Sequence, residues 1–361
     1  MAVPLFDTAT PLEPLRERLR ERAAAVLDSG RFVLGPEVEA FEAELADYLG
    51  VRQVVGVANG TDAITIALRA MGVGPGDDVV VPSFTFYASA EAVPAAGARP
   101  VFCDVDPQTF CVTADTVRAA LTPATRAVIT VDLFGNVAPA EEIEALGVAV
   151  LEDAAQAVGS SLQGRRAGAL GGAGTLSFFP SKNLGGFGDG GAIATDDERL
   201  AETARELRFH GSRDKRTHEG VGYNSRLDEL QAALLRVLLP HLDTWCAGRR
   251  AAARHYVEAG LGDYVGLPRA VEGADPAWHL YVIRHPLAQR LEPVLNRVGI
   301  GARGYYRTPV HRQPAMRGLG EAGPLPVTDE LAASNLAIPM SPVLSRAHAV
   351  EVVSAIRGAP A

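Results

Sequence analysis

The sequence predicts an α/β fold with a mainly parallel sheet that helices cover on both faces. Short apolar segments, such as residues 53–58, 78–82 and 148–153, alternate with helical segments along much of the chain. Strands that are apolar throughout are typical of parallel sheets buried on both faces. No period of 20–50 residues repeats, which argues against a solenoid. The length of 361 residues predicts two domains.

The predicted elements follow one another from residue 15 onward. Helices are expected at 15–30 and 36–50, each ended by a glycine, and a strand at 53–58 precedes a helix at 61–72. Further strands are expected at 78–82, 100–105, 126–132, 148–153, 175–179 and 191–195, with helices at 113–123 and 139–147 among them. Another helix is predicted from Arg226 to about His241.

The order of elements changes at about Trp245. From there we expect a helix, a strand at 279–285, a second helix, a strand leading into Tyr305 and Tyr306, and a last helix near 345–357. This pattern predicts a large domain over residues 1–244 and a smaller α+β domain over residues 245–361.

Composition argues against several classes of protein. A formal net charge of −9 is unfavourable for binding nucleic acid through its phosphates. No apolar run approaches the roughly 18 residues needed to span a membrane, and the N-terminus lacks the pattern of a signal peptide. Three cysteines without C-x-x-C spacing argue against a disulfide framework or a thiolate metal site. We therefore expect a cytoplasmic protein without a bound metal.

The use of lysine draws attention to one residue. Lysine occurs only at Lys182 and Lys215, and every other one of the 34 basic residues is arginine. Lys182 follows an apolar strand and precedes five glycines, in surroundings that lower a lysine pKa and favour Schiff-base chemistry. The alternative is a compositional bias that left two lysines. Lys215 lies in a charged stretch and is expected to be solvated.

Two further clusters follow predicted strands, at the edge where ligands bind in such sheets. Residues 59–62 (NGTD) open a helix and could hold a phosphate, or could be an ordinary capped turn. Residues 152–156 (EDAAQ) offer a carboxylate for a protonated ring nitrogen, or for a helix cap or salt bridge. The glycines after Lys182 precede a strand, so they do not match a dinucleotide fingerprint. A phosphate site, a carboxylate and an amine in this order specify pyridoxal phosphate.

Five motifs carry a resemblance to a known family. NGTDAI, VPSFTFYASAEA, EDAAQAVGS, SFFPSKNLGGFGDGGAI and GYNSRLDELQAA resemble, in this order, the DegT/DnrJ/EryC1/StrS family of sugar aminotransferases. The resemblance extends over nearly the whole chain. It implies the fold-type-I aminotransferase fold, pyridoxal 5′-phosphate as cofactor, and a homodimer with active sites at the subunit interface.

The resemblance also implies roles for residues around the cofactor. Lys182 would bind it as a Schiff base, Asp153 would pair with its pyridinium nitrogen, and Gln156 would lie near its ring hydroxyl. The phosphate would be held by Gly60, Thr61 and Ser177. Phe86 would stack on the ring, unless it simply packs in the core.

Other roles concern the partner subunit and the substrates. Asn224 would reach the phosphate of the neighbouring subunit's cofactor. Arg226 would bind the carboxylate of the amino donor, or form a structural ion pair with Asp228 or Glu229. On the acceptor side the candidates are Tyr306, Arg307 and His311, whose alternative is a plain loop. The segment Asp132–Asn136 departs from the His-Leu-Tyr-Gly-Gln turn of many members, which would alter acceptor specificity if the turn touches the sugar.

The implied activity is the transfer of an amino group from L-glutamate to a nucleotide-linked keto-deoxysugar. The stretch YNSRLDELQAA favours dTDP-3-keto-6-deoxyhexose, whereas Asp132 favours the 4-keto isomer. A cyclitol aminotransferase is a further alternative. From other classes, a cofactor-binding regulator without turnover and a nicotinamide oxidoreductase stay open. The family's dehydratases carry His in place of the lysine, and Lys182 argues against that activity.

Overall fold

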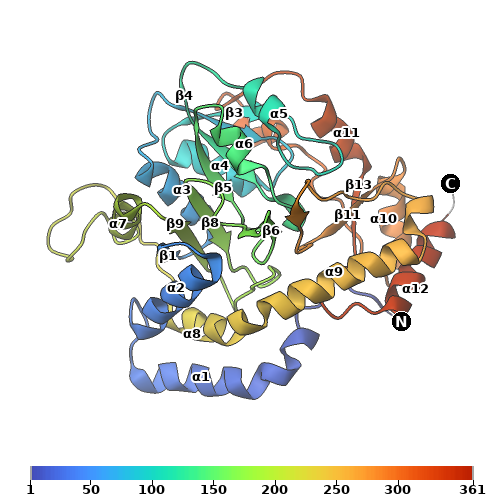
Figure 1. The fold of residues 1–361 in the computed structure, drawn as a ribbon, viewed down its shortest axis with the longest axis horizontal. Helices are drawn as coiled ribbons and strands as arrows, with labels where there is room; N and C mark the ends of the chain where they lie inside the picture. Colours follow the sequence, from blue (N-terminus) through green and yellow to red (C-terminus); the bar gives the residue numbers. More distant parts are fainter. Residues whose placement is uncertain (1, 360–361) are drawn as a thin grey trace.

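The computed structural model describes residues 2–359 and is built around an eight-stranded sheet (Figure 1). Its strand order is β1-β9-β8-β5-β4-β2-β3-β12. All neighbours from β8 to β12 pair in parallel, and β9 runs antiparallel to both β1 and β8. In chain order the strands are β1 (Gln53–Val57), β2 (Asp78–Pro82), β3 (Arg99–Cys103), β4 (Thr125–Val131), β5 (Ala149–Asp153), β8 (Ala173–Ser177), β9 (Gly191–Thr195) and β12 (Glu321–Ala322). The predicted mainly parallel α/β fold is confirmed.

Helices follow most of these strands, as the alternation in the sequence predicted. The helices of this part of the chain are α1 (Arg16–Ser29), α2 (Pro36–Leu49), α3 (Gly60–Ala70), α4 (Tyr87–Ala95), α5 (Ala114–Arg118), α6 (Ala140–Glu144), α7 (Glu198–Leu207) and α8 (Glu229–Leu238). Helix α3 packs with α4 and α7, whereas α2 and α1 both pack on α8 (Figure 1). None of the helices within residues 2–359 is long and apolar enough to cross a membrane.

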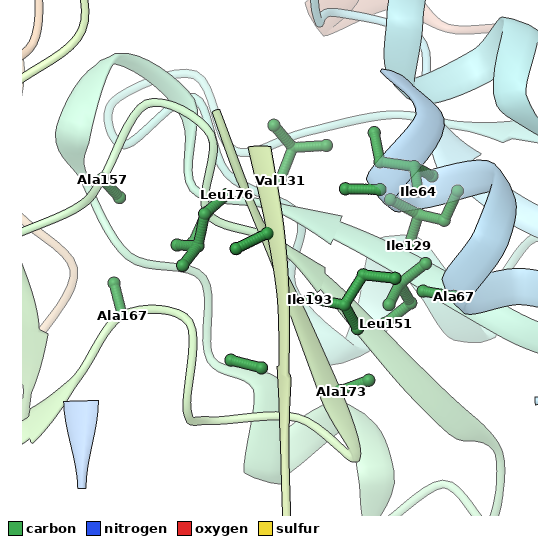
Figure 2. Packing of buried hydrophobic residues seen from close by; sticks show 14 of the residues in the cluster. Ile64, Ala67, Ile129, Val131, Leu151, Ala157, Ala167, Ala173, Leu176 and Ile193 are labelled. Carbon is green, nitrogen blue, oxygen red and sulfur yellow. The ribbon is translucent and has the colours of Figure 1, made fainter. Parts of the chain in front are cut away.

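The core under α3 fixes the position of that helix on the sheet. Ile64 and Ala67 of α3 lie in one buried cluster with Ile129 of β4, Leu151 of β5 and Ile193 of β9 (Figure 2). Burial of each of the larger aliphatic side chains stabilises the fold by roughly 1.5–3 kcal/mol. Because α3 directly follows β1, its first turn lies at the carboxyl edge of the sheet.

The C-terminal part of the chain forms a second hydrophobic cluster. Helix α9 (Leu242–Glu258) leads into a two-stranded antiparallel sheet of β11 (Tyr281–Arg284) and β13 (Asn335–Ile338), accompanied by α10 (Ala288–Arg297), α11 (Pro326–Ser334) and α12 (Arg346–Arg357). This cluster holds residues from Ala252 onward together with Val3. Strand β12, by contrast, pairs with β3 of the large sheet. The division at residue 244 stays a prediction.

The structure departs from the sequence prediction at several places, and helix α11 and strand β13 are among the elements that were not predicted. Tyr305 and Tyr306 lie in a turn, and the predicted strand there is wrong: the Tyr305 N–H donates to the Asn335 side chain (2.6 Å), so pairing ends after the Arg303–Ala337 bridge. Helix α8 begins at Glu229 instead of Arg226. A small sheet of β6 (Ser161–Leu162), β7 (Arg165–Arg166) and β10 (Ala274–Asp275) was not predicted, because two-residue strands leave no periodicity in a sequence.

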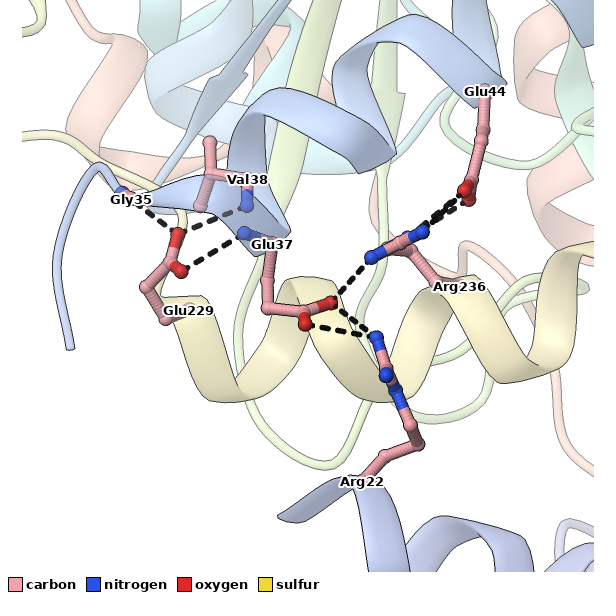
Figure 3. Close-up of polar contacts among 7 residues, drawn as sticks. All are labelled: Arg22, Gly35, Glu37, Val38, Glu44, Glu229 and Arg236. Carbon is pink, nitrogen blue, oxygen red and sulfur yellow. Dashed lines mark hydrogen bonds and ion pairs between the residues drawn. The ribbon is translucent and has the colours of Figure 1, made fainter. Parts of the chain in front are cut away.

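The buried carboxylate of Glu229 joins the start of α8 to the start of α2 (Figure 3). It accepts hydrogen bonds from the N–H groups of Gly35 (2.8 Å), Glu37 (3.0 Å) and Val38 (2.9 Å). These donors belong to the first turn of α2, where a helix has no partners of its own for its N–H groups. Glu229 therefore caps a helix nearly 200 residues away in the chain and sets the direction in which α8 leaves the large sheet.

An arginine–glutamate network continues along the same helices. Arg236 of α8 bonds to both Glu37 and Glu44 of α2, and Arg22 of α1 bonds to Glu37 from the other side (Figure 3). Glu44 is 41% exposed, so the free energy of its pair is partly screened by solvent. The network orients α1, whereas the hydrogen bonds of Glu229 hold α2.

We expect Glu229→Ala to lower the free energy of unfolding by roughly 2–4 kcal/mol, because one buried and two partly buried N–H donors lose a carboxylate acceptor. Urea denaturation followed by circular dichroism measures this loss. Glu44→Ala is the matched control on the same helix pair and should cost about 1 kcal/mol or less. Equal losses of unfolding free energy for the two variants would show that the Glu229 cap stabilises the fold no more than the exposed ion pair of Glu44.

Candidate active site

A cavity of about 870 Å³ opens at the carboxyl edge of the large sheet. Its walls come from the first turn of α3, the segment before α4, the ends of β5 and β8, and the C-terminal part of the chain. Residues predicted from the sequence that line this cavity are Gly60, Thr61, Phe86, Asp153, Gln156, Ser177, Lys182 and Tyr306. The fold therefore brings together groups spread over nearly 250 residues of sequence.

The first turn of α3 presents free donors to this cavity. The Asn59 side chain caps the helix by accepting the Asp62 N–H (2.8 Å), which leaves the N–H groups of Gly60 and Thr61 without helical partners. A Cβ atom at Gly60 would come within 2.8 Å of the Ser177 Cβ, so glycine is needed for the helix to approach the end of β8. The ordinary cap by Asn59 and an anion site thus coexist here.

Lys182 lies in a turn directly after β8. Its N–H donates to the Phe179 carbonyl (2.8 Å), and the Gly186 N–H donates to the Phe178 carbonyl (2.7 Å), which folds the glycine-rich segment back on itself. Burial lowers the pKa of Lys182 to about 8, and the nearby negative charge of Asp153 acts in the opposite direction. A larger fraction of this amine is therefore neutral near pH 7 to 8 than is the case for a solvated lysine.

Asp153 ends β5 and faces the same cavity. It accepts hydrogen bonds from the Ser89 hydroxyl (2.7 Å) and the Ala155 N–H (3.1 Å). Burial raises the pKa of Asp153, while Ser89, the Ala155 N–H and the positive charge of Lys182 act against that rise. A buried carboxyl group of this kind is suited to a cationic partner in the cavity.

Gln156 links the cavity to the turn that follows β4. Its carbonyl oxygen accepts the Phe134 N–H (2.9 Å), and its amide donates to the Tyr306 hydroxyl (3.1 Å). Both hydrogen bonds fix the direction of the amide at the end of the cavity. Phe86 is 52% exposed and lies 5.9 Å from the Tyr306 ring, so the alternative that Phe86 packs in the core is wrong.

Four of the predicted site residues lie outside the lining of this cavity. Arg307 pairs with Glu292 (3.0 Å) over a separate surface hollow, and the His311 ring lies against the Ser83 hydroxyl. Asn224 and Arg226 precede α8. Within residues 2–359 no ion pair joins Arg226 to Asp228 or Glu229, and the Glu229 carboxylate is taken up by α2.

The cavity also contains residues that sequence reasoning did not single out. His279, Arg303 and Ser89 line it. Ser89 follows Phe86 by three residues, a spacing that places both on one face of a helical turn and could have indicated it. His279 and Arg303 come from the C-terminal part of the chain, and no local pattern marks them.

The turn that departs from the resembling family is buried behind the cavity. Asp132 and Asn136 are 0% and 2% exposed, and neither lines the cavity. The Asn136 side chain bonds to the backbone of Thr109 and Arg269. The turn reaches the cavity indirectly, through the hydrogen bond of the Phe134 N–H to Gln156 and through the stacking of Phe134 on Tyr306.

Asp132 instead forms a buried pair of carboxyl groups with Glu152. The two groups act on each other's charge, the Asp132 Oδ2 has no hydrogen-bond donor among residues 2–359, and Glu152 accepts the N–H groups of Gly168 (2.7 Å) and Leu170 (2.8 Å). Two adjacent buried carboxylates cannot both be charged, and Glu152 has the backbone donors that stabilise a charge. Burial and the charge of Glu152 therefore raise the pKa of Asp132 well above its ordinary value, so Asp132 keeps the proton.

A family model described as the DegT/DnrJ/EryC1/StrS aminotransferase family matches residues 14–357. The chain belongs to this family. It is an aminotransferase, and the resemblance read from the motifs is confirmed.

Relatives of this chain are named for different sugars, and one is named for a regulatory role. A dTDP-3-amino-3,4,6-trideoxy-alpha-D-glucose transaminase of Streptomyces venezuelae is 46% identical over 98% of this chain and 95% of its own length. A UDP-N-acetyl-3-dehydro-alpha-D-glucosamine 3-aminotransferase of Acidithiobacillus ferrooxidans is 42% identical over 99% and 97%. A pleiotropic regulatory protein of Geobacillus stearothermophilus is 44% identical over 99% and 98%.

Solved structures agree with the fold. DesV of S. venezuelae, in complex with a ketimine intermediate, matches with a TM-score of 0.94 and 44% identity over 99% of this chain and 98% of that chain. NtdA of Bacillus subtilis, with bound cofactor PMP, matches with a TM-score of 0.89 and 31% identity over 99% and 85%. The fold is therefore that of the aminotransferases in this family.

We expect Asp132→Asn to change how stability depends on pH. Asp132 keeps its proton in the folded protein, whereas the unfolded chain loses it above about pH 4, so wild-type stability falls as the pH rises from there. Asparagine offers the same hydrogen bonds without titrating. The free energy of unfolding of the variant relative to wild type should therefore increase between about pH 4 and pH 8, by up to about 1.4 kcal/mol per pH unit, and its melting temperature should rise relative to wild type over the same range.

The matched control is Asp115→Asn, at a side chain that is 89% exposed. Its melting curve should run parallel to that of wild type over the same pH range. If Asp132→Asn also ran parallel, the carboxyl pair would not hold a proton in the folded protein.

Proposed function

We propose that this chain transfers an amino group from L-glutamate to a nucleotide-linked 3-keto-6-deoxysugar, with pyridoxal 5′-phosphate as cofactor. The observation that carries the proposal is the composition of one cavity. Free helix N–H groups, a buried carboxyl group and a lysine of lowered pKa meet there at the carboxyl edge of the sheet. A phosphorylated pyridine aldehyde requires these three groups.

The residues present fit this cofactor. The N–H groups of Gly60 and Thr61 and the Ser177 hydroxyl form a phosphate site at the positive end of α3. Asp153 is the carboxylate for the ring nitrogen, with Ser89 fixing its direction. When bound, pyridoxal phosphate supplies an electron sink that accepts the electrons released as a Cα–H bond breaks.

Aromatic and amide side chains of the cavity would cover the cofactor ring and keep water from it. Phe86 lines the cavity with its ring half-exposed, and the Gln156 amide donates to the Tyr306 hydroxyl (3.1 Å). Tyr306 itself lies over Phe134 at 6.3 Å between ring centroids. These side chains are fixed by one another, so the cavity keeps its shape without a ligand.

Lys182 acts as the proton carrier of the reaction. Its Nζ takes a proton from the donor carbon that bears the amino group. In the second half of the reaction, Nζ gives a proton to the sugar carbon that receives the amino group. A base is most effective when its pKa lies near the working pH, and a value of about 8 meets that condition. Burial produces this value, because the charged form of the amine is poorly solvated in the cavity.

The choice of acceptor rests on the relatives. The transaminases of S. venezuelae and A. ferrooxidans are both named for the 3-position of a nucleotide sugar. Their sugars and nucleotides differ, so the names support position 3 more strongly than dTDP. The 4-keto isomer and a cyclitol ketone remain the alternatives. Asp132, which favoured the 4-keto isomer, does not line the cavity, which weakens the support for that isomer.

The surface around Asn224 supports the proposal of a homodimer with shared sites. The backbone of Phe32 and Val33 pairs with Glu229 and Asp228, and the Phe187 N–H bonds to Gln231. The side chains of Phe32, Val33 and Phe187 are all exposed beside this segment, and so is that of Val221. A second copy that covers these apolar side chains would carry Asn224 and Arg226 toward the partner's cavity.

A regulatory role without turnover is the second candidate, because one relative is named a pleiotropic regulatory protein. A binding protein needs the phosphate site but has no need of a lysine base. The lowered pKa of Lys182 in this cavity favours the enzyme.

We expect Lys182→Ala to retain the cofactor and to lose about 1,000-fold or more in turnover, because the proton carrier is gone. Asn224→Ala should also lose activity, through weaker binding of the partner's cofactor. Co-expressed, the two variants form mixed dimers in which one site has both wild-type residues, so up to about a quarter of wild-type activity should return. Activity no higher than that of the parents would contradict a site shared between subunits, and full activity of Lys182→Ala would contradict the mechanism.

The acceptor is tested by running the reaction backwards. The cofactor-loaded enzyme is mixed separately with a dTDP-3-amino-6-deoxysugar, its 4-amino isomer and an aminocyclitol, and the cofactor absorbance is followed. We expect only the 3-amino sugar to convert the cofactor to its amine form. Conversion by the 4-amino isomer or the cyclitol alone would replace the proposed acceptor, and a spectrum unchanged by every amine, L-glutamate included, would favour the regulator.

A further inference from the structure

Arg249 is a buried cation without a carboxylate partner. It lies in the middle of α9 and is 7% exposed, and its Nη1 donates only to the carbonyl oxygens of Trp278 (3.2 Å) and His279 (3.3 Å). Within residues 2–359 no Asp or Glu forms an ion pair with it. The neighbouring Arg250 pairs with Asp275, and the equally buried Arg208 pairs with Glu42.

This arrangement costs free energy in the protein without a ligand. Removing a guanidinium group from water is expensive unless an anion compensates it, and two long hydrogen bonds to carbonyl groups are weak compensation. Burial is accordingly strong enough to lower the pKa of Arg249 to about 10. A group that is kept buried at such a cost is expected to meet its counter-ion in another state of the protein.

Arg249 lines a small hollow that adjoins the large cavity. The hollow has a volume of about 50 Å³, and its walls include Arg249, Asn183 and Trp245. It shares Lys182, Ser181 and Phe6 with the large cavity. Its size suits one carboxylate group, since a single water molecule occupies about 30 Å³.

Other polar atoms at this place also lack partners. The Asn183 side-chain oxygen, 7% exposed in the wall of the hollow, and the His279 Nδ1, 4% exposed in the wall of the cavity, are buried without a hydrogen bond. The hollow contains one acid, Asp7, whose Oδ1 accepts the N–H groups of Ala9 and Thr10. Unsatisfied buried polar atoms around an unpaired cation indicate a missing ligand.

We propose that Arg249 binds the α-carboxylate of the amino donor, the carboxylate attached to the carbon that gives up its proton. The inference rests on the proposed function, in which the donor is an amino acid. Lys182 forms a wall of both spaces, so the reacting carbon lies beside the hollow and its carboxylate, one bond away, enters it. Neither Arg226 nor Arg303 of this chain lines the hollow.

The same contact gives Arg249 a selective role. The sugar substrate carries no carboxylate at its reacting carbon, so it leaves the hollow empty. One cavity can then accept both substrates in turn, with the amino acid recognised by a group that the sugar does not use.

The test compares two donors that differ by the α-carboxylate alone. L-Glutamate has this group, and 4-aminobutyrate lacks it but keeps the distal carboxylate. The cofactor-loaded enzyme is mixed with each, and the conversion to the amine form is followed by absorbance. Arg249→Met should lower the apparent second-order rate constant for L-glutamate by about 30-fold or more, as expected when one partner of a buried charged contact is removed.

Three further measurements define the expected pattern. The rate with 4-aminobutyrate, and that with the 3-amino sugar in the reverse direction, should stay within about twofold of wild type. Arg250→Met, the adjacent residue on the same helix, should change none of these rates. The melting temperature of Arg249→Met should equal or exceed that of wild type, because an uncompensated charge leaves the interior.

Several outcomes would overturn the assignment. An equal loss with both donors, or a marked fall in melting temperature, would make Arg249 a structural residue that holds the backbone of Trp278 and His279. If Arg249→Met does not fold, Arg249→Lys keeps a charge and should slow L-glutamate alone. Wild-type enzyme that reacts equally well with both donors would also exclude the assignment. Failure of the 3-amino sugar to react would contradict the proposed acceptor, but it would not affect the comparison of the two donors.

Discussion

The structure depends on how ionisable groups are buried at the carboxyl edge of one sheet. Successive residues of a strand point to opposite faces, so Glu152 and Asp153 at the end of β5 face different surroundings. Glu152 accepts hydrogen bonds from backbone N–H groups and lies beside the protonated Asp132, so its negative charge does not face the cavity. Asp153 faces the cavity, where Ser89 holds it and where the positive charge of Lys182 acts on it.

A second constraint is steric and concerns the phosphate site. Helix α3 can present its first N–H groups next to β8 only because Gly60 and Gly191 carry no side chain. A Cβ atom at Gly191 would come within 2.4 Å of the Asn59 carbonyl oxygen, and one at Gly60 would collide with Ser177. The pairing of β8 with β9 and the packing of α3 therefore depend on each other. This mutual dependence fixes the distance from the helix end to Lys182 without any ligand.

The C-terminal part of the chain completes the cavity without forming a second binding site of its own. It contributes His279, Arg303 and Tyr306 to one wall, and α9 contributes Arg249 to the adjoining hollow. Tyr306 and Trp245 pack against the core cluster that also holds the large sheet, whereas α12 and most of the small two-stranded sheet belong to the second cluster. The wall that contains Tyr306 is therefore anchored on the same core as the strand that precedes Lys182.

The sequence by itself determined the sheet, the helices around it and many of the groups that line the cavity. Those features are local: an apolar strand, a glycine or a carboxylate at its end, and a helix cap lie within a few residues of one another, as at Asn59–Asp62 and at Lys182. The motifs around them also sufficed for the family, because they occur in a fixed order along the chain.

Tertiary structure alone decided which groups are buried and which are paired. Arg249 and Arg250 are adjacent in the sequence, and nothing local distinguishes them. The packing of α9 buries Arg249 with no carboxylate partner among residues 2–359 and pairs Arg250 with Asp275. Likewise, Glu229 follows Arg226 by three residues in the sequence, yet its carboxylate caps α2 by accepting N–H groups from a distant part of the chain. The free energy of a charge depends on neighbours brought from distant parts of the chain, and no local pattern records them.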